Sequence, residues 1–148
     1  MIECTLKRVL TCALLAVVGT ATAGTIRHAR VQPGLWEIAY TVNGTPSTNT
    51  YCITPEQANV MNSDPATVQV YIERAVAEEN GGACTVKHFR LEGNTISVIK
   101  ACGSGDSEFT TSLVRTYYGD TAESDVVSSS GGRELHIKST QKRIGVCP

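Results

Sequence analysis

Histidines are the side chains of this sequence best suited to proton transfer near neutral pH, and the chain has three. His28 precedes the first predicted strand, whereas His88 and His136 fall within predicted strands. The last two could meet only if their strands lie close together in the sheet. Neither has a third ligand at a recognisable spacing, so we expect solvated or locally hydrogen-bonded histidines and no metal site.

Nucleophiles and paired carboxylates are present, but none forms a recognised catalytic pattern. Four serines lie between residues 124 and 130, and none sits in a Gly-x-Ser-x-Gly elbow. The pairs Asp106 with Glu108 and Glu123 with Asp125 would each share one face of an extended segment, which is typical of a solvated surface. No glycine-rich phosphate loop is present. The sequence therefore predicts no catalytic residue and no cofactor.

The first 23 residues have the layout of a secretory signal peptide. Lys7 and Arg8 precede an apolar run from Val9 to Val18, and Ala21-Thr22-Ala23 suits a cleavage site after Ala23. The run is too short to span a hydrocarbon core of about 30 Å, although a retained anchor is the alternative. We therefore expect a periplasmic or secreted protein with no stable membrane span after cleavage.

Cleavage would leave four of the six cysteines, an even number that predicts two disulfides in an exported chain. The four show no Cys-x-x-Cys spacing, so structural disulfides are expected rather than a redox site. The remaining cysteines are Cys52, Cys84, Cys102 and Cys147.

Equal spacing around a turn indicates how these cysteines pair. Cys84 and Cys102 stand equally far from Gly93, the centre of a predicted β-hairpin. We favour a bond across this hairpin, which leaves Cys52 to join Cys147 and tie the front of the domain to its tail. The pairings 52–84 with 102–147 and 52–102 with 84–147 remain open.

The clearest strand runs from Leu35 to Asn43, after a turn at residues 33–34. Trp36, Ile38, Tyr40 and Val42 alternate there with small or polar residues, so we expect the first set to face the core. The functional alternative is a ligand-lining aromatic wall made by Trp36 and Tyr40. Residues 24–32 show no clear period and are interpreted as a flexible leader, so the single domain covers residues 33–148.

Helical signals are confined to one region. Thr54, Pro55 and Gln57 fit an N-cap, a first-turn proline and a capping box, and Asp64-Pro65 starts a second helix in the same way. An apolar stripe at helical spacing follows and is expected to pack on the sheet. The stripe consists of Val68, Tyr71, Ile72, Ala75 and Val76.

Strands account for most of the remaining chain. One is expected at residues 48–53, two in the hairpin from Cys84 to Cys102, and three more at residues 108–118, 121–129 and 133–142. We predict a mainly β (α+β) fold: a curved antiparallel meander of about seven strands with the helical segment covering it. A closed barrel is the alternative.

Two registers compete in the hairpin. A three-residue loop centred on Gly93 places Cys84 opposite Cys102, whereas a loop of even length pairs Phe89 with Val98 and matches apolar partners better. A β-bulge near the strand ends would satisfy both.

Several short motifs follow one another along residues 32–148. They are Pro33-Gly34-Leu35-Trp36-Glu37, Cys52-Ile53-Thr54-Pro55-Glu56, Cys84, Gly93-Asn94-Thr95, Cys102, Tyr118-Gly119-Asp120 and Lys142-Arg143-Ile144-Gly145-Val146-Cys147-Pro148. In this order they resemble the bacterial family catalogued as domain of unknown function 3617. The resemblance implies an exported, periplasmic protein of Gram-negative bacteria with no established activity and no catalytic residue to carry over. The short loop at residues 44–47 departs from the longer insertion common in that family.

Composition narrows the classes of partner. A net charge of -1 and an aromatic content of 5% give no basis for nucleic-acid binding. We expect a non-catalytic domain that binds a small apolar ligand or an envelope protein. Two alternatives remain: a small exported enzyme with His88 or His136 as general base, and a purely structural envelope protein.

Overall fold

The computed structural model describes residues 29–42 and 44–148. The expected signal peptide, residues 1–23, and His28 lie outside the described residues. No helix within the described part of the chain is long and apolar enough to cross a membrane.

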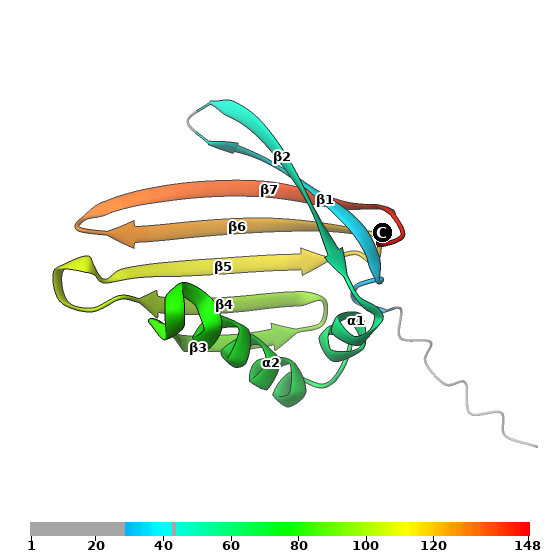
Figure 1. Ribbon diagram of the computed structural model, residues 1–148, viewed down its shortest axis with the longest axis horizontal. Helices are drawn as coiled ribbons and strands as arrows, with labels where there is room; N and C mark the ends of the chain where they lie inside the picture. Colours follow the sequence, from blue (N-terminus) through cyan, green and yellow to red (C-terminus); the bar gives the residue numbers. More distant parts are fainter. Residues whose placement is uncertain (1–28, 43) are drawn as a thin grey trace, which may run out of the picture.

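Seven antiparallel strands form one sheet in the order β2-β1-β7-β6-β5-β4-β3 (Figure 1). The two edge strands, β2 and β3, do not pair with each other, so the sheet stays open and the barrel alternative is not realised. The predicted α+β fold with a seven-stranded antiparallel sheet is confirmed. The strands are β1 (Gly34–Val42), β2 (Thr45–Ile53), β3 (Cys84–Glu92), β4 (Thr95–Cys102), β5 (Phe109–Tyr117), β6 (Thr121–Ser130) and β7 (Arg133–Gly145).

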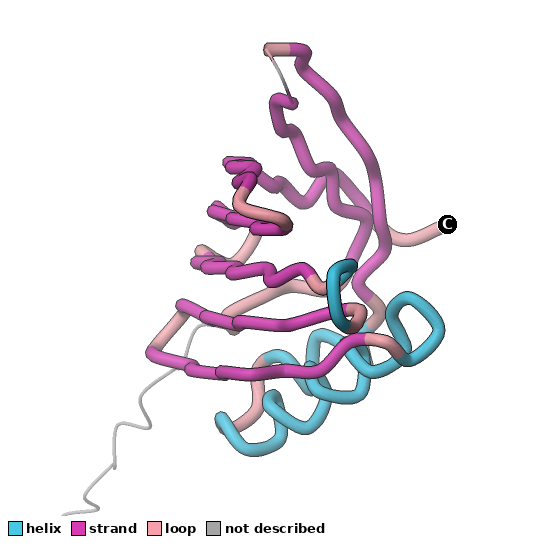
Figure 2. The backbone as a smooth tube through the Cα atoms, turned by 90° about the vertical axis from the view of Figure 1, so that its left-hand side faces the viewer, coloured by secondary structure: helices cyan, strands magenta, loops and turns pink. Residues whose placement is uncertain are grey.

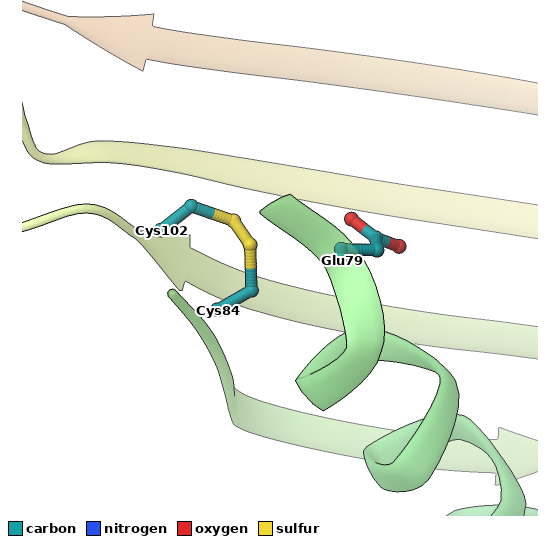
Figure 3. A group of neighbouring side chains, drawn as sticks. All are labelled: Glu79, Cys84 and Cys102. Carbon is teal, nitrogen blue, oxygen red and sulfur yellow. A yellow bond between two sulfur atoms is a disulfide. The ribbon is translucent and has the colours of Figure 1, made fainter. Parts of the chain in front are cut away.

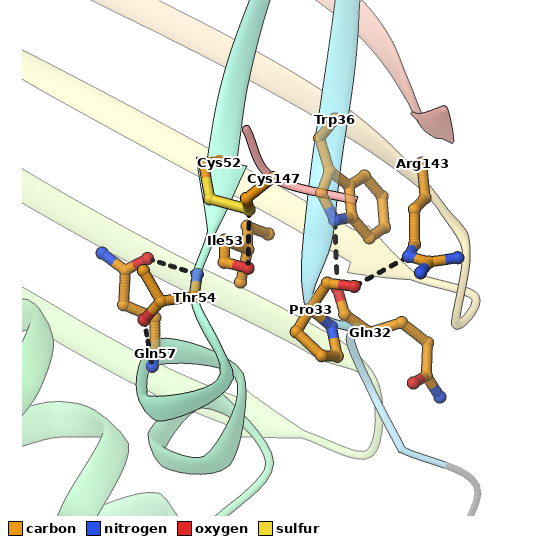
Figure 4. Close-up of a disulfide and its surroundings, with 9 residues drawn as sticks. All are labelled: Gln32, Pro33, Trp36, Cys52, Ile53, Thr54, Gln57, Arg143 and Cys147. Carbon is orange, nitrogen blue, oxygen red and sulfur yellow. Dashed lines mark hydrogen bonds between the residues drawn. A yellow bond between two sulfur atoms is a disulfide. The ribbon is translucent and has the colours of Figure 1, made fainter. Parts of the chain in front are cut away.

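The first strand of the domain pairs with the last. β1 lies antiparallel to β7, with Ile38 opposite Gln141, although about a hundred residues separate them along the chain. A disulfide between Cys52 and Cys147 holds the same junction, with the two Cα atoms 5.6 Å apart (Figure 4). The Sγ atom of Cys147 also lies 3.7 Å from the carbonyl oxygen of Ile53. Front and tail of the domain are therefore joined by both hydrogen bonds and a covalent bond.

Both predicted registers of the β3–β4 hairpin occur, because a β-bulge separates them. Cys84 lies opposite Cys102 and is disulfide-bonded to it, with the Cα atoms 4.0 Å apart. Nearer the turn, Phe89 pairs with Val98, one residue out of step with the cysteine register. Lys87 is the extra residue that absorbs the difference. The bulge considered from the sequence is confirmed.

Two helices follow β2 and lie on the same side of the sheet (Figure 2). In α1 (Pro55–Met61), Thr54 and Gln57 form the predicted capping box: the backbone N–H of Gln57 donates to Thr54 Oγ1 (3.2 Å), and that of Thr54 donates to Gln57 Oε1 (2.9 Å) (Figure 4). In α2 (Pro65–Glu78), Asp64 caps the first turn. Short 3-10 helices follow at Glu79–Gly82 and Gly105–Ser107.

Helix α2 packs along β3 and leaves the strands beyond β4 uncovered (Figures 1 and 2). Val68 and Val76 of its apolar stripe are buried, as the helical spacing predicted, whereas Ala75 stays exposed. The main core cluster lies between the helices and the sheet and includes Trp36 and Tyr117. A helix that covers only one part of a sheet leaves the rest of that face open.

The end of the expected leader is not loose in the structure. Val31 is 1% exposed and belongs to the core cluster. Its backbone N–H donates to Asn62 Oδ1 (3.0 Å), and its carbonyl accepts from Asn62 Nδ2 (2.8 Å). The Arg30 side chain donates to the carbonyl oxygens of Met61 and Gly93. The interpretation of residues 30–32 as a flexible leader is therefore corrected, because apolar burial and backbone pairing fix them.

Candidate functional site

Trp36 and Tyr40, the two candidate ligand-lining residues, do not form one wall. Trp36 is 0% exposed, and its Nε1–H donates to the carbonyl of Gln32 at 3.0 Å (Figure 4). No ligand can reach a ring buried this way, so Trp36 serves the core. Tyr40 is partly exposed, and its hydroxyl accepts a hydrogen bond from Asn49 Nδ2 at 2.9 Å.

The two strand histidines do not meet. His88 lies on edge strand β3 and His136 on β7, with β4, β5 and β6 between them. Both rings are exposed, and the nearest acid to His136 is Glu134, at 3.5 Å. The structure therefore builds no shared general-base or metal site from them.

The carboxylate pair on β6 lies on a solvated face, as expected from its spacing. Asp125 forms an ion pair with Lys138 across the β6–β7 ladder, with 3.7 Å between Oδ2 and Nζ. Glu123 is exposed. The side chain of Asp106, from the other predicted pair, lies outside what the structure describes.

Glu79, Cys84 and Cys102 bring a carboxylate oxygen and two sulfurs within 4.8 Å of one another (Figure 3). The two sulfurs are bonded to each other, so neither carries the thiolate charge that a metal ligand requires. Glu79 also forms an ion pair with Lys100. With the two cysteines oxidised, the cluster consists of a structural disulfide next to the Glu79–Lys100 ion pair.

The two faces of the sheet differ in charge. Alternate residues of a strand point to opposite faces, and the registers of neighbouring strands align these series across the sheet. We call the side that carries the helices the helix face and the other side the outer face. The acidic residues of the seven strands all belong to the outer face: Glu37, Glu92, Glu123, Asp125 and Glu134.

Charged residues in the helix-face series of the strands are all basic. Lys100 is paired with Glu79, and Arg143 bonds to the carbonyl of Pro33 and to Asp120. Arg133 is exposed near the β6–β7 turn. Arg115 lies near the middle of the sheet, on β5.

A cavity of about 310 Å³ opens on the helix face between α2 and strands β4, β5 and β6; we call it the α2 groove. Its size lies near the lower end of small-molecule sites, and most of its lining is apolar, as such sites require. The apolar side chains that line it are Ile72, Ala75, Val76, Val98, Leu113 and Val126.

The two ends of the α2 groove are polar. Lys100 lies opposite Thr111 in the β4–β5 ladder and marks one end, together with Glu79. Arg115, four residues further along β5, marks the other end, with Leu113 between them. At the rise of a β-strand this separation is about 13 Å. The groove therefore has an apolar middle, a neutralised ion pair at one end and a guanidinium at the other.

A chain of polar side chains continues from Arg115 across the helix face. Arg115 Nε donates to Ser124 Oγ (2.8 Å), which also accepts from Gln141 Nε2 (2.8 Å). The hydroxyl of Tyr51 donates to Gln141 Oε1 at 2.5 Å. Ser124 and Gln141 are 6% and 2% exposed, so this buried hydrogen-bond network orders the side chains of the sheet beside the groove.

Burial raises the pKa of the Tyr51 phenol, because the ionised oxygen would lose its hydration. The positive charge of Arg115 acts in the opposite direction, and Tyr117 adds to the increase. The Arg115 guanidinium also lies over the Tyr117 ring, 6.0 Å from its centroid. Tyr51 therefore acts as a neutral hydrogen-bond donor at physiological pH.

The terminal nitrogens of Arg115 have no hydrogen-bond partner among the residues that the structure describes. Among the described residues, Nε makes its hydrogen bond, and no carboxylate pairs with the guanidinium. No fully buried side-chain nitrogen in the described part of the chain lacks a partner, so the terminal nitrogens of Arg115 are not fully buried. Arg115 itself lines one end of the α2 groove.

A larger hollow of about 620 Å³ lies between the β1–β2 hairpin and the middle of the sheet, and Tyr40 is among its lining residues. Most of its lining belongs to the outer face and carries hydroxyl or charged groups, including the Asp125–Lys138 pair. It is a wide depression, where a ligand would keep much of its hydration. The α2 groove, with its apolar lining and free guanidinium, is the better candidate site.

Arg115 and the α2 groove were not singled out from the sequence. The available signal was the alternation in β5, where Arg115 belongs to the same inward series as Phe109, Thr111, Leu113 and Tyr117. A basic residue in an inward series indicates a buried contact or a ligand partner. The groove itself depends on where α2 lies, which no local pattern specifies.

Comparisons with known proteins point to one family. The family described as "Protein of unknown function (DUF3617)" matches residues 31–147. No curated protein and no solved structure matches the chain. The matched segment contains all seven strands, both helices and the two disulfides of the structure. The chain therefore belongs to the DUF3617 family.

Proposed function

We propose that this domain is a non-catalytic binding module of the bacterial periplasm that holds a small, largely apolar ligand in the α2 groove. The observation that carries the proposal is the groove itself: an apolar-lined cavity of about 310 Å³ on the open part of the helix face. Two disulfides are consistent with an exported protein, because such bonds persist in oxidising compartments.

The polar surroundings support binding rather than catalysis. The candidate general bases, His88 and His136, lie far from the groove on the other face of the sheet. The groove offers a guanidinium and an ion pair, which orient a ligand but do not constitute a nucleophile with its base.

Native mass spectrometry of the exported protein, together with thermal-shift measurements using decanol, tests the proposal. Ala75 lines the groove from α2, so Ala75→Trp should fill the cavity and abolish decanol binding. Ala77→Trp is the matched control, because Ala77 is exposed on the same helix and does not line the groove. Equal decanol binding by both variants, or wild-type protein that binds neither decanol nor its charged analogues, would refute the function.

A further inference from the structure

We propose that the ligand of the α2 groove is an anionic amphiphile whose carboxylate or phosphate pairs with Arg115. This inference rests on the proposed function and specifies its ligand class. The apolar chain would lie against Val98, Leu113 and Val126, with the charged head at the Arg115 end of the groove.

The distribution of charged residues on the helix face favours an anionic ligand. Every acidic residue of the seven strands is on the outer face, so no strand carboxylate competes for Arg115. The nearest acid that lines the groove is Glu79, and it is engaged with Lys100 at the other end. An anion entering the groove would therefore meet one guanidinium that is not already neutralised.

The geometry of Arg115 suits a headgroup. Its Nε–H donates to Ser124, and the guanidinium lies over the Tyr117 ring, so these two contacts orient the planar group. The terminal nitrogens remain free for the two-pronged contacts that carboxylates and phosphates favour. The guanidinium is partly buried, and no carboxylate among the described residues pairs with it, so a bound anion would supply the missing counter-charge.

The structural alternative is that Arg115 serves only to order the hydrogen-bond network that contains Ser124 and Gln141. That role needs its Nε contact with Ser124 and its position over Tyr117, but it leaves the terminal nitrogens unused. The alternative also predicts no preference between charged and neutral ligands. Ligand selectivity therefore separates the two roles.

The test measures binding of decanoate, decyl phosphate, decanol and decyltrimethylammonium by titration calorimetry, below their micelle concentrations. We expect both anions to bind about tenfold or more tightly than decanol, and the ammonium to bind most weakly. Comparison of decanoate with decyl phosphate distinguishes a carboxylate source from a phosphate source.

Variants locate the selectivity. Arg115→Met keeps most of the apolar stem, so it should lose the preference for anions and retain decanol binding. Arg115→Lys keeps the positive charge and should retain most of the preference for anions. Arg133→Met is the control, because Arg133 shares the helix face but does not line the groove. Each variant is checked for the wild-type circular dichroism spectrum and unfolding midpoint.

The outcomes separate this inference from the proposed function. Binding of decanol without preference for the anions, or an Arg115→Met protein that keeps the preference, overturns the anionic ligand and leaves the groove function intact. If Arg115→Met does not fold, the probe binding of Arg115→Lys and the relative affinities of the wild type for the four probes decide the question. Failure of all four probes to bind overturns both proposals.

Discussion

The Nε atom of Arg115 donates a 2.8 Å hydrogen bond to Oγ of Ser124, its direct neighbour across the β5–β6 ladder. This contact joins the end of the α2 groove to the buried polar network that reaches Gln141 and Tyr51. The same sheet residues therefore shape the candidate site and connect β5, β6, β7 and β2. The stability of the sheet and the proposed ligand site therefore depend on some of the same residues.

Tyr51→Phe tests the far end of this network through pH. Burial raises the Tyr51 pKa above the ordinary value of 10.0, so the unfolded chain ionises first and the wild type loses stability as pH rises above about 10. At pH 8 the variant should be less stable by about 1 kcal/mol, because Gln141 loses its donor. At pH 11 this difference should shrink or reverse.

Urea unfolding at the two pH values measures the effect of Tyr51→Phe. Tyr118→Phe is the control, because Tyr118 is 58% exposed. A stability gap between wild type and Tyr51→Phe that is unchanged at pH 11 contradicts the argument.

Asp64 should contribute to stability only where it is ionised. The side-chain and backbone hydrogen bonds from Thr67, with a further one from Ala66, hold the pKa of Asp64 below its ordinary 3.8. A lowered pKa means that the contribution is complete above about pH 4 and is lost as pH falls through the folded value. Asp64→Ala should therefore lower the melting temperature at pH 7 but much less at pH 2.5.

Asp64→Ser provides the comparison, since a serine hydroxyl can still cap α2 but does not titrate in this range. Its stability relative to Asp64→Ala should be independent of pH. An Asp64→Ala deficit that is as large at pH 2.5 as at pH 7 would show that charge plays no part in this cap.

The two disulfides should differ in their contribution to stability. Cys84–Cys102 closes a sequence separation of 18 and Cys52–Cys147 one of 95, which correspond in the loop-entropy model to about 3 and about 5 kcal/mol. Paired Cys→Ser variants should follow that order in guanidinium unfolding. The prediction fails if removing the hairpin bond costs more than removing the front-to-tail bond.

Lys87 is dispensable for the register of the β3–β4 hairpin. Its deletion removes the extra residue, so Cys84 still lies opposite Cys102 and Phe89 still pairs with Val98 in an uninterrupted ladder. We expect a folded protein with the native disulfide and a stability change of about 1 kcal/mol or less.

Deletion of Ser97 in β4 is the matched control for the Lys87 deletion. Ser97 lies opposite Arg90 on β3 and Val114 on β5, so its loss shifts one part of the strand to the wrong face. Peptide mapping and urea unfolding measure both deletions. Equal damage from the two would show that the bulge is required for the fold.

Replacing Asn62 should lower the free energy of unfolding more than replacing an exposed polar residue usually does. Its amide makes two hydrogen bonds to the backbone of Val31, which is nearly fully buried. Asn62→Ala leaves those backbone groups unpaired and should cost about 1–3 kcal/mol. Asn59→Ala, at an exposed position of the preceding helix, should change stability by about 0.5 kcal/mol or less. Urea unfolding of a chain that begins at residue 33 should show a loss at least as large as that of Asn62→Ala.

Local chemistry explains why much of the fold could be predicted. Alternation in β1, the capping box at Thr54 and the glycine turn at Gly93 each depend on residues close together in the chain. Local spacing also raised a bulge near the strand ends as one way to reconcile the cysteine and apolar registers, and the structure places it at Lys87. Periods of two and 3.6 are properties of the backbone itself, so a sequence carries them without reference to the rest of the fold.

By itself, then, the sequence determined the strands, the helices, their caps and the family resemblance. Only the tertiary structure decided that β1 lies beside β7, that Val31 is buried, and that α2 covers part of one face and leaves Arg115 at the end of a groove. These features join segments that are distant in the chain. Their free energy comes from pairing and burial between whole elements, which no local pattern encodes.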